Sequence, residues 1–246
     1  MLPGFVDPHQ HSCFVALFSA LLEDVGFLVY PTRDQLIAGL KALDAKLPPG
    51  RWLAAYNFDN LLQGGDLKMA ELDGVSKERP ILVWYVNMHD GAANSAAFKI
   101  AQIPPDVGLL PGGGYFGRGP DGAFNGLVYE ESAMLKFVTH ALPPVTPATF
   151  AEAMIEYFKV SAALGNTTHE PGTVQPDWIE GLARLTARGT GRLSASLMYD
   201  AGTARARRSA PCASSKQPSR AAAPWMTPSS ARIRRSPWRR RCAPSP

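Results

Sequence analysis

The feature that most constrains this chain is a change of composition near Asp200. Residues 1–200 contain 14 basic and 21 acidic residues, a net charge of −7. Residues 201–246 contain 11 basic residues and no acidic one, a net charge of +11. The overall charge of +4 is thus the sum of two unlike parts. Each part has to be interpreted separately, because only the first has the composition of a globular domain.

Residues 1–200 alternate between segments typical of helices and of strands. Apolar residues recur at helical spacing in some segments, and short runs rich in β-branched and aromatic residues occur in others. Thr146 is a plausible N-cap and Gly165 a plausible C-terminal stop for one helix, whereas the Gly/Pro-rich residues 104–125 predict an irregular loop. This order is typical of a parallel α/β fold. The predicted helices are 36–47, 147–164 and 177–188, and the predicted strands are 4–7, 80–86, 166–169 and 193–199.

Residues 201–246 are predicted to be a disordered basic tail. Ile233 is the single residue of the Ile/Leu/Val/Phe set in this segment, so it has too little apolar surface to offset its chain entropy. One interpretation is a basic arm that binds nucleic acid or acidic surfaces. The other is a sequence never selected to fold, such as a shifted reading frame. The abrupt start of the tail directly after a predicted strand favours the second interpretation.

Composition also excludes several classes of protein. Three cysteines in 246 residues do not make a disulfide framework, and no apolar run is long enough to cross a membrane. No positively charged segment precedes the apolar residues 13–22, so a signal peptide is not expected. We therefore expect a cytoplasmic protein with no membrane partner.

His9 and His11 are the strongest local signal for chemistry. Residues two apart on an extended segment point to the same side, so both imidazoles can meet one metal ion. Asp7 is placed to accept a hydrogen bond that fixes a histidine tautomer. Alternatively, both histidines simply face solvent near the N-terminus.

The surrounding residues resemble a known family. Residues 2–11 read Leu-Pro-Gly-Phe-Val-Asp-Pro-His-Gln-His, which resembles the first barrel strand of the amidohydrolase superfamily. Further matches point to the amidohydrolase-3 family, which includes YtcJ-like proteins and N-substituted formamide deformylases. These matches follow the order of the family's motifs through residues 2–200. They are Leu72-Asp73, Arg79-Pro80, the segment from His89 to Asn94-Ser95, the segment 126–130, and the segment 165–172.

The resemblance implies part of a (β/α)8 TIM barrel with a divalent metal, expected to be zinc, at the carboxyl ends of its strands. His9 and His11 would be ligands from the first strand, and residues 12–164 would hold the first helix and a large insertion. His169 would end the second strand, and residues 193–199 would form the third. The implied domains are therefore a truncated barrel portion, 1–200, and the tail, 201–246.

The resemblance also implies that much of the family's site is missing. No histidine follows His169 and no acidic residue follows Asp200, so the later ligands and the general-base aspartate are not found. We expect a hydrolase of carbon–nitrogen bonds other than peptide bonds, such as amides or formamides, that is weakly active or inactive. The alternative is a non-catalytic fragment whose basic tail binds nucleic acid non-specifically or binds acidic surfaces.

Three further residues are candidates for the substrate pocket. His89 and Glu130 belong to the matched segments, and His169 would lie at the end of the second strand. Structural roles explain the first two residues equally well: His89 as a loop histidine hydrogen-bonded to the backbone, and Glu130 as a carboxylate that stabilises the start of a helix. The expected partner is a small-molecule amide. An open barrel edge would also permit self-association.

Overall fold

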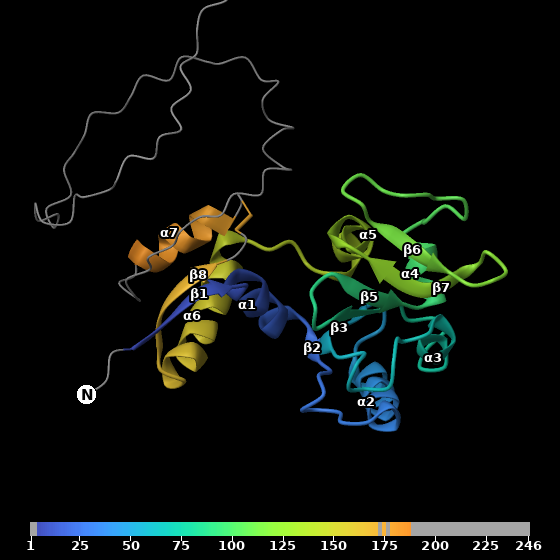
Figure 1. The fold of residues 1–246 in the computed structure, drawn as a ribbon, viewed down its shortest axis with the longest axis horizontal. Helices are drawn as coiled ribbons and strands as arrows, with labels where there is room; N and C mark the ends of the chain where they lie inside the picture. The colour runs from blue at the N-terminus through green and yellow to red at the C-terminus, as the bar shows by residue number, and fades with distance from the viewer. Residues whose placement is uncertain (1–3, 172–173, 176–177, 188–246) are drawn as a thin grey trace, which may run out of the picture. The chain divides into compact units, whose positions relative to one another are not determined.

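The computed structural model describes residues 4–171, 174–175 and 178–187 (Figure 1). All described residues belong to one unit of the chain, Met1–Ala206. The predicted strand 193–199 and the predicted tail 201–246 lie outside the described residues.

Two segments far apart in the sequence form a parallel pair of strands. β1 (Phe5–Gln10) lies beside β8 (Asn166–Pro171), so that Phe5 pairs with Asn166 and Asp7 pairs with His169 (Figure 1). α1 (Ser12–Leu21) follows β1, α6 (Pro147–Ala163) precedes β8, and α7 (Ile179–Ala187) follows β8. The strand predicted for 4–7 thus reaches Gln10 and includes His9.

The residues between α1 and α6 form a six-stranded mixed sheet in the order β2-β3-β4-β5-β7-β6. β2, β3 and β4 run parallel, whereas the β4–β5, β5–β7 and β7–β6 pairs are antiparallel. The parallel α/β fold expected from the sequence therefore holds for β2, β3 and β4, but it is wrong for β5, β6 and β7, which pair antiparallel. The elements are β2 (Glu23–Asp24), α2 (Arg33–Lys46), β3 (Leu53–Phe58), α3 (Met69–Asp73), β4 (Ile81–Tyr85), β5 (Asp90–Ala93), α4 (Ser95–Ile100), β6 (Tyr115–Arg118), β7 (Phe124–Tyr129) and α5 (Glu131–Ala141).

The best-defined sequence signals agree with this structure. Thr146 caps α6 by accepting a hydrogen bond from the Thr149 amide, and Pro147 is the first helical residue. Gly165 follows with a φ of +92°, a conformation that a residue with a Cβ atom rarely adopts. Every residue of β4 is buried, and alternate side chains enter the two hydrophobic cores on opposite faces of the sheet.

The loop predicted over 104–125 is wrong in its second half. β6 and the start of β7 lie there, joined by a turn in which Gly119 donates to the Ala123 carbonyl and Gly122 has a φ of +79°. Phe116 and Phe124 pack edge-to-face with a ring separation of 5.8 Å. The glycines therefore build a hairpin turn, and the burial of two aromatic rings outweighs the low strand propensity of the segment.

Asn94 is the polar centre of this sheet. Its side chain is fully buried and makes four hydrogen bonds to backbone groups. Oδ1 accepts from the amides of Ile81 and Ala97, while Nδ2 donates to the carbonyls of Ser76 and Arg79. One side chain thus joins the start of β4, the start of α4 and the loop before β4.

Replacing Asn94 is expected to destabilise the protein strongly. Asn94→Ala leaves two buried amides and two carbonyls without partners, and each such group costs about 1–3 kcal/mol. We expect the free energy of unfolding in urea to fall by about 3 kcal/mol or more. Asn60→Ala is the matched control, because it removes one hydrogen bond, to Asp66. A loss no larger than that of the control would contradict the role assigned to Asn94.

The described residues do not close a barrel: β1 and β8 form a two-stranded sheet separate from the six-stranded one. The fold they show is a mixed α/β fold. No helix among them is long and apolar enough to cross a membrane.

Candidate functional site

The two histidines predicted to bind metal lie next to each other at the carboxyl end of β1. His9 is exposed and belongs to the strand, whereas His11 is the N-cap residue of α1 and makes no capping hydrogen bond through its side chain. Their rings pack edge-to-face with centres 5.3 Å apart. Asp7 accepts a hydrogen bond from the backbone amide of His9 at 3.2 Å, so it holds the main chain here and not the ring.

The ring separation fits two ligands of one ion. With Zn–N bonds of about 2.0–2.1 Å and a tetrahedral angle, two imidazole centres lie about 5 Å apart. Across the part of the chain that the structure describes, no group of three or more His, Cys, Asp or Glu side chains is placed to hold a metal ion. The residues present therefore fit two ligands of a metal centre.

Cys13 does not extend this pair. Its side chain is fully buried in the hydrophobic core, and burial raises the pKa of its thiol to about 11. A thiol must be deprotonated to bind metal well, so Cys13 acts here as a small apolar side chain.

His169 lies on β8, beside β1, and its ring faces α6. The side chain is 7% exposed, and its two ring nitrogens contact Gln10 Oε1 through Nδ1 and Ser161 Oγ through Nε2, the latter at 3.1 Å. Because an amide oxygen can only accept, Nδ1 donates to Gln10 and Nε2 accepts from the Ser161 hydroxyl. The pocket role predicted for His169 stays a prediction, but both of its polar atoms are engaged inside the fold.

Burial lowers the pKa of His169, and the nearby Asp7 carboxylate opposes this shift. Between the lowered pKa and the ordinary value of about 6.5, the unfolded chain binds more protons at this residue than the folded protein does. His169 therefore contributes full stability above pH 6.5 and loses that contribution as the pH falls.

The pH dependence of unfolding tests this environment. We expect the free energy of unfolding of the wild type to fall from pH 7.5 to pH 5.5, and the fall to be smaller in His169→Asn. His140→Asn is the control, since His140 is an exposed residue at the end of α5. Equal slopes for the wild type and His169→Asn would show that His169 does not titrate differently on folding.

His89 and Glu130 are brought together by the β5–β7 pairing. His89 Nδ1 lies 3.0 Å from Glu130 Oε2, and the Glu130 amide donates to the His89 carbonyl at 2.7 Å. Glu130 has a φ of +67° and a ψ of 158°, a region that glycine normally occupies. Both side chains are open to solvent, 68% and 47% exposed, so this pair is free to contact a small molecule.

Several of the motifs that resembled the family build the scaffold. Asp73 accepts hydrogen bonds from the Ser95 amide and hydroxyl, at 3.0 and 2.7 Å. Arg79 pairs with Asp44 and donates to the Leu47 carbonyl, so it holds the carboxyl end of α2. These motif residues, like Asn94, hold elements of the six-stranded sheet together and are not grouped with His9 and His11.

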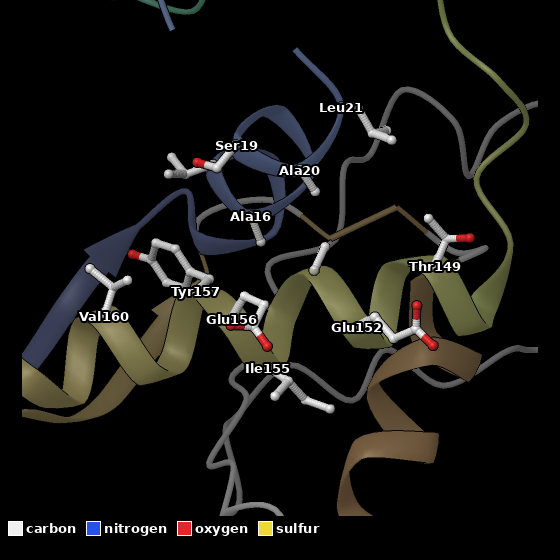
Figure 2. Close-up of a pocket in the computed structure, with 12 residues that line it drawn as sticks. Ala16, Ser19, Ala20, Leu21, Thr149, Glu152, Ile155, Glu156, Tyr157 and Val160 are labelled. Atoms are coloured by element: carbon white, nitrogen blue, oxygen red, sulfur yellow. The ribbon is translucent and has the colours of Figure 1, made fainter. Parts of the chain in front are cut away.

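A groove of about 830 Å³ lies between α1 and α6. Figure 2 shows Ala16 and Ala20 on the side of α1 toward α6, which contributes Tyr157 and Val160 to the lining. None of the predicted site residues lines this groove. It is therefore a feature of the helix layer, separate from the histidine pair.

Comparison with known proteins decides the family. Residues 1–239 match the model of the Amidohydrolase family. The chain belongs to the amidohydrolase family. The match extends past residue 200, so the predicted boundary between barrel portion and tail stays a prediction.

This amidohydrolase chain is similar to two curated proteins. It is 33% identical over 201 residues to the exoenzymes regulatory protein AepA of Pectobacterium carotovorum subsp. carotovorum, covering 77% of this chain and 41% of that protein. It is 30% identical over 165 residues to the putative amidohydrolase YtcJ of Bacillus subtilis (strain 168), covering 65% of this chain and 29% of that protein. The chain therefore spans less than half the length of either relative.

A solved structure shares the fold. The crystal structure of an uncharacterized metal-dependent hydrolase from Pyrococcus horikoshii OT3 matches with a TM-score of 0.50 at 16% sequence identity. The match covers 79% of this chain and 36% of that one. At this identity the similarity describes the fold alone.

Sequence reasoning missed two polar residues at this site. Gln10 lies between the two histidines in the sequence, and strand alternation could have placed it on the opposite face. Ser161 gave no signal, because a serine in a helix usually faces solvent, whereas here it is 4% exposed.

Proposed function

We propose that this amidohydrolase chain supplies two ligands, His9 and His11, to the divalent metal centre of a hydrolase. The substrates we propose are small molecules with carbon–nitrogen bonds other than peptide bonds, such as amides or formamides. The observation that carries the proposal is the 5.3 Å separation of the two imidazole rings at the carboxyl end of a strand.

The proposal treats β1 and β8 as neighbouring strands of a (β/α)8 barrel. Their parallel pairing and the helices α6 before and α7 after β8 support this interpretation. In such barrels the functional residues lie at the carboxyl ends of the strands, where His9 and His11 lie here. The six-stranded sheet would then be an insertion between the first helix and the second strand.

Zinc is the metal we propose, because imidazole is a ligand that suits it. When bound, such an ion lowers the pKa of a water molecule to about 7 and polarises a carbonyl group. His9 and His11 would hold the ion through neutral ring nitrogens. His89 and Glu130 would contact the substrate, with the Glu130 carboxylate fixing the orientation of the His89 ring.

Turnover by this chain alone is proposed to be weak or absent. A catalytic zinc usually has three protein ligands, and the described residues provide two. The second edge of β1 has no strand partner among the described residues, and Phe5 and Val6 are 66% and 64% exposed. This edge would permit association with another copy of the chain.

Zinc titration tests the metal site. We expect the wild type to bind zinc weakly, His9→Ala to lose at least about tenfold in affinity, and His140→Ala to bind like the wild type. Binding should weaken as the pH is lowered, because protons compete with the metal ion for the ring nitrogens. The measurement is competition with a coloured chelator at fixed pH.

Hydrolysis of N-formyl and N-acyl amines is assayed in parallel, with and without chelator. Tight stoichiometric zinc with clear turnover in a monomer would contradict the two-ligand proposal. Zinc binding that does not change in His9→Ala would contradict the site itself.

A further inference from the structure

The backbone of β1 does not by itself fix the position of the histidine pair. Between Asp7 and Gln10 the strand advances three residues, while its partner β8 advances two, from His169 to Pro171. The extra residue is a bulge, which interrupts the ladder of backbone hydrogen bonds. Pro8 and Pro171 have no amide hydrogen to donate, and the His9 amide donates to its own neighbour Asp7.

A chain of side-chain hydrogen bonds crosses the strand pair at this bulge. Gln10, between the two histidines, accepts from His169 Nδ1. Ser161 donates to His169 Nε2 and accepts from Asn166 Nδ2 at 3.3 Å. The network therefore joins β1 to β8 and to α6.

The surroundings of this network make it persistent. His169 and Ser161 are 7% and 4% exposed, and the rings of Tyr157 and Phe158 lie 6.1 and 5.5 Å from the His169 ring. Breaking a hydrogen bond here would leave buried polar atoms without partners. Gln10 is thus held firmly although the strand ladder is interrupted beside it.

We propose that His169 is a positioning residue that acts through Gln10 to hold His9 and His11 side by side. Because Gln10 lies between the two histidines in the chain, anchoring its side chain to His169 fixes the short stretch of backbone from which both imidazoles project. The inference rests on the proposed function for the metal, but the positioning itself is a property of the metal-free protein.

Two variants of His169 separate positioning from mere packing. In His169→Asn the amide nitrogen is bonded to Cγ, as Nδ1 is, so it can still donate to Gln10. In His169→Gln the amide lies one bond further out, near the place of Nε2, so it keeps the bond to Ser161 and loses the one to Gln10. Both variants remove the ring, so a purely structural role predicts similar effects.

The first readout uses metal-free protein and needs no activity. We expect a nuclear Overhauser contact between the His9 and His11 rings in the wild type and in His169→Asn. We expect it to be lost in His169→Gln and in Gln10→Leu. Urea unfolding of all four proteins shows that each is folded under the conditions used.

The second readout is zinc affinity by chelator competition. We expect His169→Gln and Gln10→Leu to bind about 10–100-fold more weakly than the wild type, and His169→Asn to remain within about threefold. Equal affinities and an intact ring contact in all four proteins would overturn the inference. Equal losses in the Asn and Gln variants would also overturn it, since packing alone would explain them.

The two proposals fail in different ways. If the ring contact follows the expected pattern but zinc binding is unchanged by His9→Ala, the positioning role stands and the metal proposal fails. If zinc binding depends on His9 but His169→Gln matches the wild type in both readouts, the positioning role fails and the metal proposal stands.

Discussion

The parallel pairing of β1 with β8 is the interaction on which the rest of the structure depends. It joins residues 5–10 to residues 166–171 and so brings the histidine pair, Gln10 and His169 into one place. The long segment between the two strands begins with α1 and ends with α6, and these two helices pack together (Figure 1). Because the two ends of this segment lie close together, the six-stranded sheet between them does not separate the paired strands.

Local signals in the sequence were sufficient for the elements whose ends have chemical markers. Thr146, Pro147 and Gly165 mark α6 correctly, and the apolar run of β4 predicts a buried strand. The hairpin of β6 and β7 could not be predicted in the same way. Its glycines suggest a loop. The contact between Phe116 and Phe124 offsets the low strand propensity of this segment, but it joins two different strands and so is not revealed by local spacing.

In the candidate site, too, local sequence predicted some features and not others. The closeness of His9 and His11 follows from their spacing, and the pair His89–Glu130 joins two residues chosen from separate motifs. The burial of His169 against Ser161 did not follow from sequence, because it is a contact between β8 and α6, which local patterns do not reveal. The bulge at Pro8 and His9 shifts the register of β1 against β8, so strand alternation alone does not place Gln10 beside His169 either.

The central claim is that the two imidazoles of this amidohydrolase chain bind one metal ion. Zinc K-edge X-ray absorption of the chain loaded with one equivalent of zinc tests it most directly. The account predicts two imidazole ligands at about 2.0–2.1 Å, and one in His9→Ala. A spectrum without imidazole scattering, or one identical in the wild type and His9→Ala, would contradict it.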